Sequence, residues 1–342
     1  MLQVVIDRPG LHDRLVVHER PDPIAGPGEV RVRVRAIGVN YADCIVRMGL
    51  YASAREYVGW PITPGFEVSG EVDAIGDGVD PSLLGAEVIA LTRFGGYASA
   101  VVVPAHQVFR APTGLDLVRA AGVPAVFLTA YYALFELAHP RPGSTILVHS
   151  AAGGVGSALL QLARVAGCEA VAVVGASHKV AAAAALGAKA VIDKSREDLW
   201  AAAERHAPGG YQVICDANGV STLGQSYRHL APTGKLVIYG FHSMLPRSGR
   251  VRWLRLAFDW LRTPRFNPLR LTNENRSVLA FNLSYLFDAR EVLGEAMAKI
   301  LGWIAAGEVT LPAVTTYPLR QVADAQRALE SGQTVGKLVL VP

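Results

Sequence analysis

The chain has 342 residues, of which 51% are hydrophobic and 18% are charged, and its formal net charge is +4. This length is enough for two domains with a core each, and the composition is typical of a globular α/β enzyme, which excludes a disordered or fibrous chain. Because three scattered cysteines make no disulfide framework, no apolar run is long enough to span a bilayer and no secretory signal opens the chain, we expect a cytoplasmic protein.

The first part of the chain, to about residue 120, predicts an all-β, barrel-like domain. Glu29–Val39 alternates valine with arginine, which is the period of a strand with one buried face. Turn residues such as Gly76–Gly78 separate the other predicted strands. These strands are Val68–Ile75, Glu87–Leu91 and Ala98–Val103.

The next part carries a glycine-rich turn between a strand and a helix. Thr145–His149 is a short apolar run typical of a buried strand, and apolar residues recur at helical spacing from Val155 to Gly167. Glycines in such a turn let the backbone approach a pyrophosphate, whose charge then lies on the N–H groups of the helix start. An α/β domain that binds no nucleotide is the alternative. The residues predicted to bind the phosphates are Ala152, Gly153, Gly154, Val155 and Gly156.

More strands alternate with helical segments after this turn. They are predicted at Ala170–Val174, Ala190–Ile192, Tyr211–Cys215 and Lys235–Tyr239, with a helix end at Ala181–Gly187. Short apolar strands that alternate with helices predict a doubly wound parallel sheet of the Rossmann type, with right-handed crossovers.

The residues after the second strand of this unit distinguish NADP from NAD. NAD sites usually place Asp or Glu there to bind the ribose hydroxyls. This chain instead has Gly175, followed by Ser177 and Lys179, and Lys194 comes just after the third strand. A hydroxyl and cations without a carboxylate favour a 2′-phosphate, so we expect NADPH. Ordinary solvated lysines are the alternative reading of Lys179 and Lys194.

A basic amphipathic segment interrupts the pattern at about 242–275. Arg247–Arg270 holds seven arginines and one acid, Asp259, with apolar residues at roughly helical spacing. Such a segment is typical of contact with an anionic membrane surface, a polyanion or a hydrophobic substrate. A lid or subunit contact with solvated arginines is the alternative, because arginine stems also cover apolar surface. No specific nucleic acid is predicted.

The last stretch is expected to return to the first domain, because its final strand, Lys337–Val341, needs a sheet to join. Before it come a predicted helix at Glu295–Ala306, a strand at Thr315–Tyr317 and a helix at Val322–Leu329. The expected domains are therefore residues 1–122 with 290–342, and residues 123–289.

The sequence resembles the zinc-independent quinone oxidoreductase branch of the medium-chain dehydrogenase/reductase superfamily over essentially its whole length. Within that branch it is most similar to the vesicle amine transport protein-like group, and Val123–Tyr132 is also similar to enoyl reductase modules of polyketide synthases. Ser144 departs from the branch signature at a surface turn. The segments that carry the resemblance are Gly38–Asp43, Arg47–Tyr51, Pro64–Gly70, Val148–Gly156 and Val335–Val339. It implies a GroES-like β-barrel catalytic domain, a Rossmann cofactor domain, and a homodimer formed through the edge of the nucleotide-domain sheet.

The same resemblance argues against a catalytic zinc ion. Zinc-dependent relatives place Cys and His where this chain has Asn40 and Phe66, and neither side chain is a ligand that catalytic zinc takes. Without a Lewis acid, the favoured substrates are apolar small molecules that are already electron-poor, such as quinones, enones and enals. The protein must then supply orientation, exclusion of water and a hydrogen-bond donor.

Catalytic roles follow from the resemblance to enoyl-thioester reductases. Tyr51 is the candidate proton donor, with simple packing beside the substrate as the alternative. Asn40 and Asp43 are expected to orient the cleft, although Asp43 has an equally economical role as a partner of Arg47, four residues on.

The resemblance also assigns coenzyme contacts outside the glycine turn. Thr129 matches a threonine near the nicotinamide, Ser177, Lys179 and Lys194 are placed at the 2′-phosphate, and Lys337 either reaches the nucleotide or lies on the surface. Further residues are expected to border the ribose or nicotinamide. These are Asn218, Phe241, Phe281 and Leu283.

The sequence thus predicts an NADPH-dependent reductase of quinones or activated C=C bonds. Two alternatives stay open: a discrete enoyl-thioester reductase, and a non-catalytic NADPH-binding protein whose basic segment binds a membrane or a polyanion.

Overall fold

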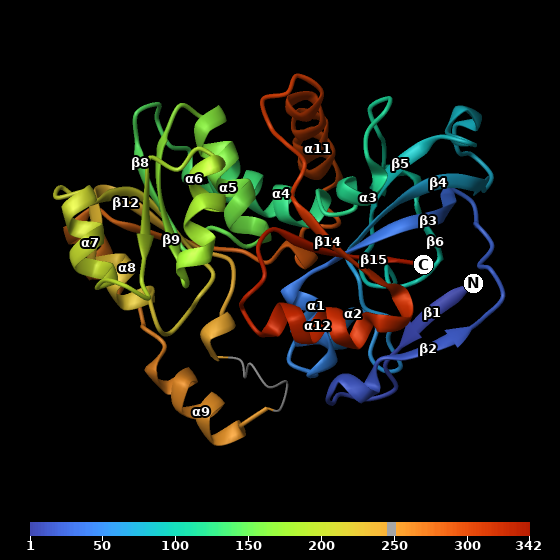
Figure 1. Cartoon of the computed structure of the whole chain (residues 1–342), viewed down its shortest axis with the longest axis horizontal. Coiled ribbons are helices and arrows are strands. Elements are labelled where there is room, and N and C mark those ends of the chain that lie inside the picture. The colour runs from blue at the N-terminus through green and yellow to red at the C-terminus, as the bar shows by residue number, and fades with distance from the viewer. Residues whose placement is uncertain (245–250) are drawn as a thin grey trace. The chain divides into compact units, whose positions relative to one another are not determined.

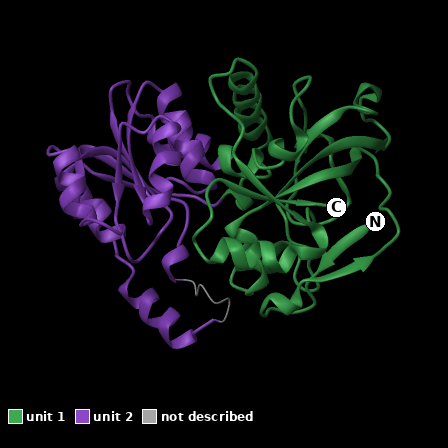
Figure 2. Ribbon diagram, in the orientation of Figure 1, with its two compact units in different colours: residues 1–128, 247–250, 283–342 green, residues 129–246, 251–282 purple. Residues whose placement is uncertain are grey.

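The computed structural model describes residues 1–244 and 251–342 (Figure 1). These residues form two compact units: 1–128 with 283–342, and 129–244 with 251–282 (Figure 2). Of the basic segment, Arg247 and Arg250 lie outside the described residues.

The first unit is built on a mainly antiparallel sheet of strand order β14-β15-β3-β4-β5-β7, with β6 also pairing with β3. The alternating pattern of β3 places Val30, Val32 and Val34 in the core, whereas Arg31 and Arg33 reach Asp73 on β4. The strands are β3 (Glu29–Val39), β4 (Glu67–Ile75), β5 (Glu87–Leu91), β6 (Ala100–Pro104), β7 (Val108–Arg110), β14 (Val314–Pro318) and β15 (Lys337–Val341).

The C-terminal strand joins this sheet, as expected. Leu338 of β15 pairs antiparallel with Val39 of β3, and β14 runs parallel to β15 on its other side. A small separate hairpin, β1 (Leu2–Val5) with β2 (Val16–Glu19), opens the chain. The helices of this part are α1 (Tyr41–Arg47), α2 (Ala52–Tyr57), α3 (Leu117–Ala120), α11 (Arg290–Ala305) and α12 (Val322–Glu330), and α4 (Pro124–Tyr131) leads into the second unit.

The second unit contains a parallel sheet of strand order β10-β9-β8-β11-β12-β13, which confirms the doubly wound prediction. The order reverses between β8 and β11, and ligands of such sheets bind at the carboxyl ends of the strands at this point. The edge strand β13 was not predicted. The strands are β8 (Thr145–Val148), β9 (Glu169–Val174), β10 (Ala190–Asp193), β11 (Tyr211–Asp216), β12 (Leu230–Ile238) and β13 (Ser277–Ala280).

Helices cover both faces of this sheet. Figure 1 shows α5 and α6 on one side of it and α7 and α8 on the other. The described part of the basic segment includes the helices α9 and α10. The helix bounds are α5 (Gly154–Val165), α6 (Val180–Ala185), α7 (Leu199–His206), α8 (Leu223–Arg228), α9 (Trp253–Arg262) and α10 (Pro268–Glu274). Within the described residues, no helix has the length and apolar character needed to cross a membrane.

Candidate functional site

The glycine-rich turn connects β8 to α5, and the predicted phosphate-binding residues lie at the first turn of that helix. Gly153 is the N-cap of α5, and its N–H donates to the carbonyl of Ser150 at 3.0 Å. A Cβ at Gly156 would lie 2.6 Å from Cα of Ala151, so only glycine fits there. The close approach leaves the first N–H groups of α5 facing the carboxyl end of β8, where a phosphate group binds in sheets of this type.

A buried polar network fixes the strand ends beside this turn. Ser150, which has a left-handed backbone with φ of 53°, donates to Oδ1 of Asn218 at 3.0 Å. Asn218 is held in turn by Asp216, whose Oδ1 accepts its N–H at 2.8 Å and whose Oδ2 accepts from Ser226. His149 contacts the same Ser226 hydroxyl at 3.1 Å, and burial lowers the pKa of His149. The structure therefore brings Asn218 next to the glycine turn.

The predicted 2′-phosphate residues gather at the ends of β9 and β10. A Cβ at Gly175 would lie 3.6 Å from Cε of Lys194, so the lysine stem passes beside this glycine. Ser177 and Lys179 belong to the short helical turn Ser177–Lys179 that follows Gly175. A glycine, a hydroxyl and a lysine stem thus share this corner.

Two further residues at this corner were not predicted. Asp193, the last residue of β10, accepts from Ser177 Oγ at 2.6 Å and from Ser195 Oγ at 2.6 Å. These hydrogen bonds lower the pKa of Asp193. Nε of Arg196 donates to Ser177 Oγ at 3.1 Å, which adds a cation to the corner. Sequence reasoning missed Asp193 and Arg196 because it looked for the residues that select the coenzyme only after the second strand. Both residues lie at or after the end of the third strand.

In the first unit, Asn40 belongs to a cluster with Glu67 and Lys337. Nδ2 of Asn40 donates to Oε1 of Glu67 at 2.8 Å, and Nζ of Lys337 donates to Oδ1 of Asn40 at 2.5 Å. The Lys337 ammonium also pairs with Oε1 of Glu67 at 2.7 Å. Only 3% of the Lys337 side chain is exposed, so the surface alternative for this lysine is wrong.

Asp43 is fully buried and supports the backbone around Asn40. It accepts from Asn40 N at 2.7 Å, from Gly65 N at 3.0 Å and from the Tyr97 hydroxyl at 2.9 Å. Burial raises the pKa of Asp43 to about 7. The alternative that pairs Asp43 with Arg47 is wrong, because Arg47 bonds to Glu330 at the end of α12 instead. Asp43 is therefore a positioning residue.

Tyr51 lies in a cluster of three aromatic rings. Its ring centroid is 5.7 Å from that of Phe66 and 6.3 Å from that of Phe94, in edge-to-face geometry. Phe94 has φ of 69°, a conformation that bulky residues rarely adopt and that strained sites retain. Phe94 therefore contributes its ring to the cluster although its backbone conformation is strained. Phe66 and Phe94 belong to the buried core, and the partly buried Tyr51 ring packs at its edge.

The remaining residues that were predicted to contact the coenzyme lie at several places in the structure. Phe241 lies beside Gly219, the residue after Asn218, because a Cβ at Gly219 would lie 2.9 Å from the Phe241 ring. Phe281 packs against Tyr132, with ring centroids 4.8 Å apart. Thr129 lies near the end of α4, and Leu283 begins a short helical turn after Phe281.

Comparisons with known proteins agree with this geometry. Residues 26–113 match the alcohol dehydrogenase GroES-like domain family, and residues 186–340 match a family described as zinc-binding dehydrogenase. The chain is 34% identical over 335 residues to the synaptic vesicle membrane protein VAT-1 homolog of Rattus norvegicus, covering 97% of this chain and 82% of the relative. The chain belongs to the medium-chain dehydrogenase/reductase superfamily. Its place is in the quinone oxidoreductase branch.

Two more members of the superfamily align along their full length. A 2-haloacrylate reductase from Burkholderia is 31% identical over 351 residues, covering 100% of this chain and 99% of the relative. The crystal structure of Escherichia coli quinone oxidoreductase complexed with NADPH has a TM-score of 0.86 and 27% identity, covering 100% of both chains. The two-unit architecture is therefore that of an oxidoreductase superfamily.

Asn40 and Phe66 stand where the sequence resemblance expects the zinc ligands of other members. Phe66 is 5% exposed and packs in the aromatic cluster, and Asn40 is bonded to Lys337 and Glu67. Among the described residues, no group of His, Cys, Asp and Glu side chains is placed to hold a metal ion. Phenylalanine and asparagine side chains offer zinc none of its usual ligands.

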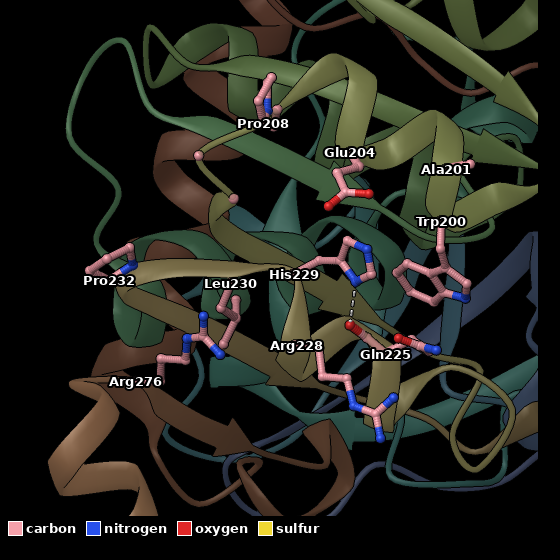
Figure 3. A pocket seen from close by; sticks show the side chains of 13 residues that line it. Trp200, Ala201, Glu204, Pro208, Gln225, Arg228, His229, Leu230, Pro232 and Arg276 are labelled. Atoms are coloured by element: carbon pink, nitrogen blue, oxygen red, sulfur yellow. Dashed lines mark hydrogen bonds between the residues drawn. The ribbon is translucent and has the colours of Figure 1, made fainter.

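A separate cavity of about 550 Å³ lies between α7 and α8 in the second unit (Figure 3). Trp200 and His229 border it with stacked rings 4.7 Å apart, and Arg228 and Arg276 add positive charge. None of the predicted site residues lines it. Sequence reasoning missed this cavity because its residues carry no motif.

Proposed function

We propose that the protein is a zinc-independent, NADPH-dependent oxidoreductase that reduces activated C=C bonds or quinones. One observation carries the proposal: the glycine turn at Gly153–Gly156 and the corner of Gly175, Ser177 and Lys194 lie at the carboxyl ends of one parallel sheet. This arrangement suits a dinucleotide with a 2′-phosphate. The superfamily relation to quinone oxidoreductases and a 2-haloacrylate reductase supports the substrate class.

The fit of the residues to NADPH can be stated group by group. The first turn of α5 would bind the pyrophosphate, and Lys179, Lys194 and Arg196 would bind the 2′-phosphate. Ser177 could donate to that phosphate only by giving up its hydrogen bond to Asp193. NADPH, when bound, supplies a hydride. The chain's own tasks are to hold the substrate flat against an apolar surface and to provide a proton.

Tyr51 is the proposed proton donor. When hydride adds to the β-carbon of an enone, the C=C electron pair moves toward the carbonyl oxygen, and a proton must then reach the α-carbon. The phenol of Tyr51, whose ring is fixed by Phe66 and Phe94, is a suitable acid for that step. A quinone instead yields a hydroquinone oxyanion that water protonates readily.

The test is coenzyme consumption with a naphthoquinone, a cyclic enone, a 2-alkenal and a crotonyl thioester, with NADPH and NADH compared. NADPH-selective turnover of the quinone or the enone supports the proposal. Turnover restricted to the thioester would favour the enoyl-thioester reductase. NADPH binding without turnover of any substrate would refute the reductase.

A variant separates the proton donor from the binding surface. Tyr51→Phe keeps the ring contacts and removes the acid, so it should lower kcat for the enone by about 100-fold. Quinone reduction by the same variant should change little. Equal effects on both substrates would contradict the assignment of Tyr51.

A second candidate function rests on α9. Its apolar side chains face outward, with Leu254 91% exposed, Trp253 68% and Trp260 65%. Arginines flank them at positions 252, 255 and 262, and Arg255 is 3.7 Å from Asp259. A helix with aromatic and leucine side chains beside arginines is typical of one that lies on an anionic lipid surface. We therefore propose that α9 also binds anionic membranes.

Vesicle flotation tests this second function. Binding to vesicles with phosphatidylserine, but not to pure phosphatidylcholine, should be lost in both Leu254→Ser/Leu261→Ser and Arg255→Gln/Arg262→Gln. Loss of heparin binding in the arginine variant alone would indicate a polyanion partner instead. Arg320→Gln, which changes an exposed arginine in the first unit, is the control.

We further propose a homodimer and a cytoplasmic location. β13 is an edge strand whose backbone pairs with β12 on one side, and an edge of this kind can pair with a second copy. Light scattering during size-exclusion chromatography should give twice the chain mass. Ala280→Pro, which removes a backbone donor from the side of β13 that faces away from β12, should shift it to one chain mass.

A further inference from the structure

Three side chains from distant parts of the chain meet beside the start of α1. Asn40 precedes that helix, Glu67 is the first residue of β4, and Lys337 is the first residue of β15. Neither the ammonium nor the carboxylate faces water, since 3% of Lys337 and none of Glu67 is exposed. Burying a charged pair costs free energy unless both charges are well hydrogen-bonded. Here the ammonium of Lys337 and the carboxylate of Glu67 each also bind the side-chain amide of Asn40.

The hydrogen-bond roles in the cluster are fixed by chemistry. An ammonium group only donates and a carboxylate only accepts. Oδ1 of Asn40 must therefore face Lys337, at 2.5 Å, and Nδ2 must face Glu67, at 2.8 Å. An amide turned by 180° would set two donors against each other and two acceptors against each other. The pair thus holds the Asn40 amide in one orientation.

The carboxylate itself is held rigidly. Oε2 of Glu67 accepts the backbone N–H of Ala125 at 2.7 Å, which leaves Oε1 for Asn40 and Lys337. The backbone of β3 closes over it, because a Cβ at Gly38 would lie 2.6 Å from Cδ of Glu67 and 2.5 Å from the carbonyl oxygen of Ala121. Glu67 therefore has no room to follow a movement of Asn40.

One hydrogen of the Asn40 amide is left over. The amide nitrogen has two hydrogens and Glu67 takes one; none of the described residues accepts the second. Asn40 is half-buried, so its side chain is not closed off from solvent on every side. Lys337 and Glu67 fix the orientation of the amide. A ligand at this position would therefore meet its N–H donor and not its carbonyl oxygen.

We propose that Lys337 and Glu67 are positioning residues that present Asn40 Nδ2–H to the carbonyl oxygen of the substrate. This inference rests on the proposed reductase function. NADPH, when bound, would supply the hydride for the new C–H bond at the β-carbon; the C=C electron pair would then become that of an enolate, with its negative charge on the carbonyl oxygen. The Asn40 N–H donates to that oxygen, and the enolate then takes a proton at its α-carbon. A fixed donor of this kind stabilises the charge without having to reorient.

Lys337→Met is the first test, because it keeps the length of the side chain and removes the charge and the donors. We expect kcat for the enone to fall about 10- to 100-fold, while KM for NADPH changes less than threefold. Lys189→Met, which removes an exposed lysine of the second unit, is the matched control and should change neither.

A double-mutant comparison distinguishes positioning from a direct role. If Lys337 acts through Asn40, Lys337→Met should have almost no further effect on kcat in an Asn40→Ala background. Equal losses in both backgrounds would overturn the inference. Asn40→Asp should lose as much activity as Asn40→Ala, because a carboxylate pairs with Lys337 but has no N–H to offer.

A direct readout of the amide makes the test independent of turnover. With selective ¹⁵N-asparagine labelling, the Asn40 side chain should give two sharp, separate N–H signals in the wild type. In Lys337→Met the chemical shifts of both N–H signals should move toward those of a solvent-exposed asparagine amide; unchanged chemical shifts would overturn the inference. If burial of Glu67 without its partner unfolds the single variant, Lys337→Met/Glu67→Gln removes both charges, and Glu71→Gln on the exposed side of β4 is its control.

The outcomes separate the two proposals. Wild-type protein that turns over none of the substrates overturns the reductase and this inference together. Wild-type turnover that Lys337→Met leaves unchanged overturns this inference alone.

Discussion

Gly156 offers a sharp test of how the nucleotide turn is built. An alanine Cβ at this position would lie 2.6 Å from Cα of Ala151 and 2.9 Å from its carbonyl carbon, both of them backbone atoms. Overpacking of this kind costs about 1–3 kcal/mol, and the better helix propensity of alanine returns at most about 1 kcal/mol. Since neither backbone atom can swing aside, we expect Gly156→Ala to destabilise the fold by about 2 kcal/mol.

The displacement of α5 that Gly156→Ala causes should also weaken NADPH binding. A start of α5 that moves away from Ser150 misplaces N–H groups that bond a pyrophosphate, and one hydrogen bond to a charged group contributes about 1.5–3 kcal/mol. NADPH affinity should therefore fall by about tenfold or more. Titration of NADPH by its fluorescence measures the affinity, and urea unfolding measures stability, where 2 kcal/mol corresponds to a midpoint about 1 M lower.

Gly294→Ala is the matched control, because Gly294 lies inside α11 and a Cβ there meets nothing within 4 Å. Alanine should stabilise this helix by up to about 1 kcal/mol, and NADPH affinity should be unchanged. Opposite signs for the two substitutions are the expected result. If Gly156→Ala matched the control in both assays, the close-packing account of the turn would be refuted.

Three more predictions concern charge. Lys194→Ala should reduce the preference for NADPH over NADH by about tenfold in Kd, whereas Lys189→Ala should not; an unchanged preference would remove Lys194 from the 2′-phosphate corner. Arg47→Met should lower stability to urea by about 3–5 kcal/mol because it leaves Glu330 buried without its partner, and Arg47→Met/Glu330→Gln should cost less than the two single changes added together. Burial lowers the pKa of His149 below the usual 6.5, so the unfolded chain binds a proton there that the folded chain does not, and stability should fall as pH drops below 6.5. His149→Gln should reduce that loss between pH 7 and pH 5 in urea unfolding, unlike the control His206→Gln.

The elements that the sequence predicted well are those with a strong local signal. β3 and β5 have the expected bounds, and the expected glycine stop of α5 is found at Gly167, which has φ of 68°. Periodicity and glycine placement depend on neighbouring residues only, so a single sequence carries them. The short edge strand β13 has four residues and gave no such signal.

Pairings between distant residues were beyond the same reasoning. The i, i+4 rule offered Asp43 as one possible partner of Arg47, but the arginine bonds Glu330, 283 positions away. Lys337 was predicted either to contact the nucleotide or to lie on the surface. In the structure it is buried and donates to Asn40, 297 positions away. Local spacing proposes partners within one helix, whereas the sheet that joins β15 to β3 decides which side chains actually meet.

The spacing of apolar residues in the basic segment predicted only part of its structure. The helical spacing correctly predicted α9, but the apolar residues of the segment do not share one role. Phe266 packs on the core side, with its ring 5.4 Å from that of Tyr227, while Leu254 and Leu261 of α9 are exposed. A hydrophobic pattern shows that a face exists, and only the fold shows whether that face is already covered.

The cluster at Asn40 bears on the substrate class. Asn40 is bonded to the ammonium of Lys337, and Glu67 offsets the charge of that ammonium. An ammonium can orient a donor, but it does not polarise a carbonyl as a Lewis acid does. A site of this kind stabilises the oxyanion of a substrate that is already prone to accept hydride. If the proposed reductase function holds, we expect it to reduce conjugated carbonyl compounds in preference to simple aldehydes, and the ratio of enone to simple aldehyde reduction should fall when Asn40 loses its N–H.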